Sequence, residues 1–184
     1  MEITKIMPAE DVNRTFKRFA HQILEPFDDA AHPAVIGMQT RGVHIARRIL
    51  NVIESEYSQR PDFGILDVTF YRDDFRTRLK VPAVQITEIP FDLYDRDVIL
   101  VDDVLYTGRT VRSAMDALMD YGRPRSIHFC CMVDRGHREL PITADYVGIR
   151  VPTHQNEEVQ VKVKELDGED AVYLVNVDME QDHG

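Results

Sequence analysis

Residues 98–110 constrain the fold of this chain more than any other stretch. The first four residues are apolar in succession, the pattern of a short strand buried on both faces of a parallel sheet. A loop with two carboxylates, two threonines and a glycine follows, and from Val111 onward apolar residues recur at helical spacing. The stretch therefore predicts strand, loop and helix, with the loop at the carboxyl end of the strand, where open α/β sheets bind ligands.

The loop suits a ligand that carries a phosphate beside a sugar. The N-terminus of the helix attracts an anion, and Gly108 can take the positive φ that lets the backbone wrap around it. Asp102 and Asp103 would repel a bare phosphate, so they address ribose hydroxyls, a bound Mg²⁺ or positive charge developing on a sugar carbon. An ordinary polar turn is the alternative. All thirteen residues resemble the signature of the type I phosphoribosyltransferases, which bind phosphoribosyl pyrophosphate (PRPP).

Composition is that of a soluble globular protein. The 184 residues can bury a sizeable core, and we expect a single domain over residues 1–184. No apolar run approaches the roughly 18–20 residues that span a bilayer, and residues 1–5 lack a signal-peptide pattern. Cys130 and Cys131 are expected to be reduced core residues, which favours a cytoplasmic location. The net charge of −10 argues against a broadly basic nucleic-acid surface and leaves room for a local basic patch.

Apolar periodicity predicts the other elements of an α/β domain, and Gly122 stands where a C-terminal helix cap is expected. The predicted helices cover residues 8–27, 43–53 and 111–118, and the predicted strands cover residues 34–37, 63–71, 84–86, 98–101, 126–133 and 145–148. Alternating apolar residues at 159–163 and 172–174 indicate an antiparallel pair near the C-terminus.

A second strand, loop and helix unit carries Thr40, Arg41 and Gly42 in its loop. An arginine suits bidentate phosphate contact, and a glycine lets backbone N–H groups approach the ligand. The loop resembles the short pyrophosphate loop of type I phosphoribosyltransferases, although a plain turn would explain it when taken alone.

Residues 72–80 are highly charged and have no apolar period. A mobile exposed loop is one interpretation. The other is a lid that brings Arg76, Arg78 and Lys80 over a pyrophosphate leaving group.

Residues 71–74, 98–110 and 133–141 together resemble the PyrR family, and the similarity extends from residues 18–21 to residues 170–172. PyrR proteins regulate pyrimidine operons by binding nascent messenger RNA and also act as uracil phosphoribosyltransferases. The resemblance implies the type I phosphoribosyltransferase fold: a mainly parallel central sheet flanked by helices, a small hood and an antiparallel C-terminal pair.

The resemblance also implies a reaction, in which uracil displaces pyrophosphate from PRPP to give UMP. Asp102 and Asp103 are the expected catalytic residues, with no dedicated catalytic base or metal site, because Mg²⁺ would be bound mainly through PRPP and water. The residues expected to bind PRPP or the nucleotide and base are Thr40, Arg41, Gly42, Val104, Leu105, Tyr106, Thr107, Gly108, Arg109, Thr110, Arg135 and Val159.

The family's RNA-binding pattern is matched at Arg18, His21 and Arg138, whereas Thr143 and Lys17 depart from it. UMP-responsive binding to a pyrimidine-operon leader RNA is therefore a prediction, and a homo-oligomer, a dimer or larger, would be needed to widen the patch. Two alternatives stay open: an RNA-binding attenuator with vestigial catalysis, and a type I phosphoribosyltransferase for another base.

Overall fold

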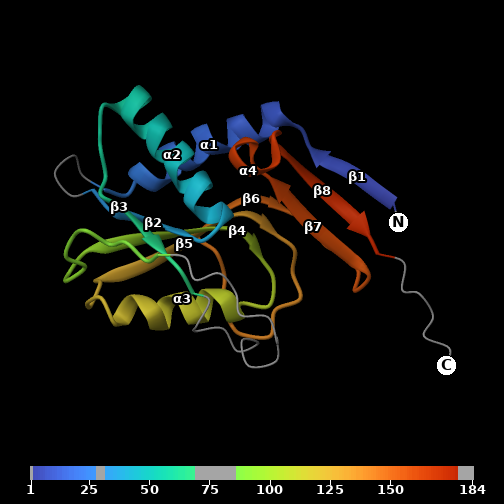
Figure 1. The fold of residues 1–184 in the computed structure, drawn as a ribbon. Coiled ribbons are helices and arrows are strands. Elements are labelled where there is room, and N and C mark those ends of the chain that lie inside the picture. Colours follow the sequence, from blue (N-terminus) through green and yellow to red (C-terminus); the bar gives the residue numbers. More distant parts are fainter. Residues whose placement is uncertain (1, 28–31, 69–85, 178–184) are drawn as a thin grey trace.

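The computed structural model describes residues 2–27, 32–68 and 86–177 of the protein. Its larger sheet is parallel, with the strand order β3-β2-β4-β5-β6 (Figure 1). The strands are β2 (Ala34–Met38), β3 (Phe63–Leu66), β4 (Asp97–Leu105), β5 (Ser126–Asp134) and β6 (Tyr146–Arg150). Central β4 is buried along Val98–Val101, as its run of apolar residues predicts.

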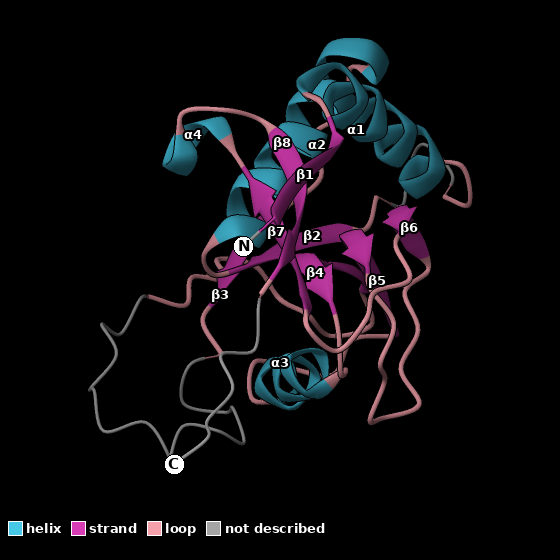
Figure 2. Cartoon of the chain, turned by 90° about the vertical axis from the view of Figure 1, so that its right-hand side faces the viewer, coloured by secondary structure: helices cyan, strands magenta, loops and turns pink. Residues whose placement is uncertain are grey.

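Helices cover both faces of this sheet, as Figure 2 shows. On one face lie α1 (Ala9–Leu24) and α2 (Arg41–Tyr57), which share a core with Ile99 of β4. On the other face lies α3 (Arg109–Met119), which packs with the neighbouring Leu100. Successive side chains of a strand point to opposite faces, so β4 contributes alternately to the two cores.

A second, antiparallel sheet lies beside the first, with the strand order β1-β8-β7 (Figure 1). It consists of β1 (Glu2–Met7), β7 (Glu157–Lys162) and β8 (Ala171–Asn176), and the short helix α4 (Lys164–Asp167) connects the last two. We call this sheet with α4 the hood. Val161 and Val172 of the hood join the core of α1 and α2, so the two sheets are packed together.

The predicted C-terminal pair is confirmed, but a third strand, β1, was not predicted. Only its last residue is buried, and Ile3 is 54% exposed. An edge strand with so little buried surface leaves no strong apolar alternation in the sequence.

Other boundaries also differ from the prediction. Strand β3 ends at Leu66, earlier than the predicted strand 63–71. Residues 69–85 lie outside the described part of the chain. They include most of the expected strand 84–86 and the expected lid residues Arg76, Arg78 and Lys80. Helix α3 ends at Met119 with Asp120 as its cap, so Gly122 lies beyond the cap position.

Both cysteines are buried and form no disulfide, as expected. Burial raises the pKa of both thiols, which keeps them protonated. Among the helices described, none is long and apolar enough to cross a membrane.

Candidate functional site

The site begins where β4 extends beyond its neighbour β2. The register pairs β2 with β4 only as far as Gly37 and Val101, whereas β4 continues beside β5 until Leu105 lies opposite Asp134. The strand thus includes Asp102 and Asp103, which the sequence placed just after its end. Because β2 has stopped, these carboxylates lie at the carboxyl edge of the sheet beside the start of α2.

The two aspartates have different surroundings. Asp102 is 9% exposed, and its Oδ1 accepts a hydrogen bond from the backbone N–H of Asp103 at 2.9 Å. Asp103 is less buried, and its Oδ1 accepts the N–H of Val104 at 2.8 Å. Asp103 is the aspartate that borders a cavity of about 330 Å³. The other residues that line this cavity are Arg41, Val159, Gln160, Val161 and Lys162.

The start of α2 also borders the cavity, through Arg41. The Gln39–Thr40 peptide is cis, and Arg41 is the first residue of the helix. A Cβ atom on Gly42 would overlap the carbonyl oxygen of Val101 and lie 3.1 Å from the Cα atom of Asp102. The absence of a side chain at this glycine therefore lets the first turn of α2 lie against β4, so that Arg41 and Asp103 border one cavity.

Residues 106–108 connect β4 to α3, and we call them the PRPP-type loop. A hydroxyl of this loop and the loop after β5 hold it in shape. Gly108 has φ 90° and precedes the first residue of α3. The N–H of Arg109 donates to Thr107 Oγ1 at 3.3 Å, and the carbonyl oxygen of Thr107 accepts the N–H groups of Glu139 and Leu140 at 3.0 and 3.2 Å. The loop is thereby ordered with the N-terminus of α3 directly behind it, which suits a phosphate.

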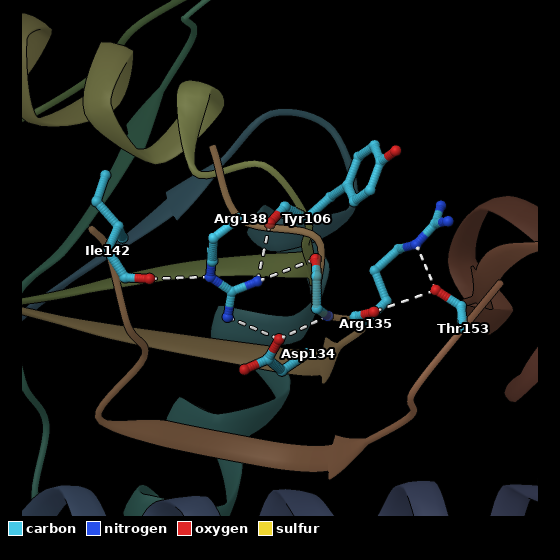
Figure 3. Close-up of polar contacts among 7 residues, drawn as sticks. Tyr106, Asp134, Arg135, Arg138, Ile142 and Thr153 are labelled. Atoms are coloured by element: carbon cyan, nitrogen blue, oxygen red, sulfur yellow. Dashed lines mark hydrogen bonds and ion pairs between the residues drawn. The ribbon is translucent and has the colours of Figure 1, made fainter. Parts of the chain in front are cut away.

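Arg135 ties this loop to the hood. Its side chain is largely buried, and its guanidinium carbon lies 4.1 Å from the centre of the Tyr106 ring (Figure 3). Its Nη2 donates to the carbonyl oxygen of Glu157 at 2.6 Å, and its Nε donates to Thr153 Oγ1 at 3.3 Å. A stacked, hydrogen-bonded arginine of this kind positions the tyrosine next to the start of β7.

Arg138 is used inside the loop that follows β5. Its guanidinium donates to Asp134 Oδ1 at 2.7 Å and to the carbonyl oxygens of Tyr106 and Ile142 at 2.8 and 2.9 Å (Figure 3). A further bond reaches the carbonyl oxygen of Gly136 at 3.3 Å. Arg138 thus joins the loop after β5 to the PRPP-type loop, a role that the sequence did not predict. A contact between Arg138 and RNA stays a prediction.

The other two expected RNA-binding residues lie elsewhere. Arg18 donates to the carbonyl oxygens of Val147 and Gly148 in β6, at 3.0 and 2.7 Å, and His21 Nδ1 lies 3.3 Å from the hydroxyl of Tyr57. Both are on α1, on the opposite face of the sheet from α3, whereas the Arg138 loop packs beside the start of α3 (Figure 2). One chain thus places Arg18 and His21 together and Arg138 apart from them.

The arrangement matches a known class of protein. The phosphoribosyl transferase domain family matches residues 3–166, so the chain belongs to it. Solved structures agree on the fold, including a hypoxanthine-guanine phosphoribosyltransferase from Bacillus anthracis (TM-score 0.71, 20% identity, covering 96% of this chain and 100% of that one). A hypoxanthine phosphoribosyltransferase of Trypanosoma cruzi gives a TM-score of 0.70 at 15% identity, covering 95% of this chain and 97% of that one. The predicted type I phosphoribosyltransferase fold is therefore confirmed.

Sequence similarity identifies the particular family. The chain is 49% identical over 170 residues to the "Bifunctional protein PyrR" of Elusimicrobium minutum, covering 92% of this chain and 95% of that protein. It is 50% identical over 170 residues to the protein of the same name in Thermus aquaticus, covering 92% and 94%. The chain belongs to the PyrR family, which confirms the resemblance seen in the sequence.

Proposed function

We propose that the cavity between β4, α2 and β7 is where uracil and PRPP react to give UMP and pyrophosphate. As a PyrR protein, the chain is a uracil phosphoribosyltransferase and a regulator of pyrimidine operon transcription. The observation that supports the proposed place of reaction is that Asp103 and Arg41, from segments far apart in the sequence, border one cavity.

The reaction forms a bond between a uracil ring nitrogen and the anomeric carbon, while the bond from that carbon to pyrophosphate breaks and the proton of the uracil nitrogen leaves to water. Positive charge develops on the sugar in the transition state, and the Asp103 carboxylate stabilises it from the cavity wall. The loop before α3 binds the 5′-phosphate through its N–H groups, and Arg41 faces the pyrophosphate. Rate acceleration then comes from positioning and electrostatics.

Magnesium fits this site as a companion of the substrate. Among the described residues, no group of three His, Cys, Asp or Glu side chains could hold a metal ion by itself. Mg²⁺ keeps several waters and binds readily through one carboxylate and substrate phosphates, so Asp103 is the protein ligand that we expect. Its contribution would be to neutralise charge on the departing pyrophosphate.

The regulatory role implies further partners. We expect a pyrimidine-operon leader RNA to bind, with UMP as the signal that strengthens binding by favouring the RNA-competent state. Because Arg138 lies apart from Arg18 and His21 in one chain, a homo-oligomer would be needed to extend the RNA surface. A protein that uses free nucleotides and binds nascent RNA would work in the cytoplasm, and we expect this one there.

A base panel with two matched variants tests the proposed site. The wild type should form nucleotide from uracil, PRPP and Mg²⁺ far faster than from cytosine, hypoxanthine or guanine. Asp103→Asn should lower kcat/KM by about 100-fold, as loss of a transition-state charge interaction does, and Asp102→Asn should also slow the reaction. Asp116→Asn, on the exposed side of α3, is the control. Full activity of both Asp103→Asn and Asp102→Asn, or preference for a purine, would contradict the proposal.

A further inference from the structure

Asp167, the last residue of α4, is shared by two cations of the cavity. Its Oδ1 accepts a hydrogen bond from Arg41 Nη2 at 2.9 Å, and Lys162 Nζ lies 3.7 Å from the same oxygen. Its Oδ2 accepts the backbone N–H of Val163 at 2.9 Å. The carboxylate is 13% exposed, whereas both cations line the cavity.

The surroundings of Asp167 keep it ionised. Burial by itself would raise its pKa, but the hydrogen bonds from the N–H of Val163 and from Arg41 outweigh burial and hold the pKa below its ordinary value. A buried carboxylate that is fixed by the backbone N–H of Val163 is a rigid anchor for a long, flexible cation.

The guanidinium of Arg41 is held at one nitrogen and has donors to spare. A guanidinium carries five N–H donors. Within the described residues Nη2 meets Asp167, whereas Nε is buried without a hydrogen-bond partner. Nε is shielded from solvent, but the Arg41 side chain is 34% exposed and lines the cavity beside Lys162, so its outer nitrogens can meet a ligand there.

The contact is not needed merely to attach the hood to α2, because a second contact already does so. Seven residues further along the helix, Arg48 donates to Asp170 Oδ2 at 2.7 Å and to both oxygens of Glu165. Asp170 is as buried as Asp167, with 9% exposure, but its arginine does not line the cavity.

We propose that Asp167 is a positioning residue of the hood, which holds Arg41 and Lys162 so that their remaining donors meet the pyrophosphate of PRPP. The inference rests on the proposed function of the cavity. It implies that the hood acts on the phosphate side of the reaction through α4, besides contributing β7 to the cavity wall.

The test compares Asp167→Asn with Asp170→Asn, two equally buried hood carboxylates. Asp167→Asn should raise the KM for PRPP and the inhibition constant of pyrophosphate about tenfold, as expected when one charge-assisted contact no longer orders its cation. The KM for uracil should stay within about twofold, since the base contacts other residues. Asp170→Asn should leave both phosphate constants near wild type.

Combining variants shows whether Asp167 acts through the arginine. Arg41→Gln should impair PRPP binding by itself, and adding Asp167→Asn to it should weaken binding little further, because the partner is already absent. Urea unfolding of each variant separates a folding defect from a positioning defect.

The outcomes distinguish this inference from the proposed function. If the wild type makes UMP and Asp167→Asn leaves the KM for PRPP unchanged, or changes it no more than Asp170→Asn does, the positioning role is wrong and the catalytic site stands. If the wild type makes no UMP, calorimetric titration of the wild type and Asp167→Asn with pyrophosphate tests the positioning role by itself. Weaker binding by Asp167→Asn would then support the positioning role, and equal binding would overturn it.

Discussion

Removing Arg48 should loosen the hood from the main sheet, and the structure allows the size of the effect to be worked out. Its side chain is 19% exposed, and its partner Asp170 is 9% exposed. In Arg48→Met the alkyl stem can still cover Phe16, over whose ring the guanidinium now lies, but the Asp170 carboxylate loses its cation. The backbone N–H of Lys164 would be its remaining hydrogen-bond donor among those the structure shows.

Breaking a fully buried ion pair costs about 3–5 kcal/mol, because one charge stays buried without compensation. The pair with Glu165 adds at most about 1 kcal/mol, since that carboxylate is 38% exposed and screened by water. Because Arg48 itself reaches solvent, we expect a total loss of about 2–3 kcal/mol, which lowers the Tm of a domain of this size by about 5–10 °C.

Urea unfolding at neutral pH measures the loss, with Arg14→Met as the control. Arg14 is 73% exposed, and its ion pairs with described residues are to Glu10 and Asp11 of the same helix, so its loss should cost less than about 0.5 kcal/mol. Adding Asp170→Asn to Arg48→Met should recover part of the stability by removing the uncompensated charge. Equal stability of Arg48→Met and the wild type would refute the reasoning.

The loss of stability in Arg48→Met should depend on pH. The hydrogen bonds from Arg48 hold the pKa of Glu165 below its ordinary value of 4.5. The resulting stability is present above that value and is lost as the pH falls through the lowered pKa. The difference between Arg48→Met and the wild type should therefore narrow in acid, below about pH 4.

Two further predictions concern the loop glycine and the RNA. Gly42→Ala should lower the free energy of unfolding in urea by about 1–3 kcal/mol, because a Cβ there would push α2 away from Val101 and Asp102. It should also lower kcat/KM, since the same shift would displace Arg41 from Asp103. Unchanged kinetics would contradict this reasoning. Arg18→Ala should weaken filter binding of a pyrimidine-operon leader RNA, and the slope of log affinity against log salt should fall by about one if that arginine contacts a phosphate. An unchanged slope would assign Arg18 to its bonds with β6 alone.

Much of the fold and the class of ligand site followed from local patterns in the sequence. The apolar run at 98–101, the loop after it and the helical repeat from Val111 each depend on neighbouring residues, so a strand, a loop and a helix could be predicted with the loop at the ligand edge. The antiparallel strands β7 and β8 were predictable for the same reason, whereas the mostly exposed β1 carried too weak a pattern.

The tertiary structure decided which of the two adjacent aspartates borders the cavity. The sequence predicted a strand that stops at residue 101, but β4 continues because β5 still pairs with it after β2 has ended. Asp102 is thereby buried, while Asp103 reaches the cavity. The end of a strand depends on how long its neighbours continue, and no pattern within the strand itself contains that information.

The partners of the charged side chains were likewise settled only by the fold. Arg138 has the residue type of an RNA contact, yet its guanidinium hydrogen-bonds to Asp134 and Tyr106. Arg41 meets Asp167 across 126 positions of the chain. By itself the sequence determined the local elements and the chemistry of the loops. Which cation meets which carboxylate was decided by the packing of the hood on α2, because such pairing depends on distance in space and not on spacing in the chain.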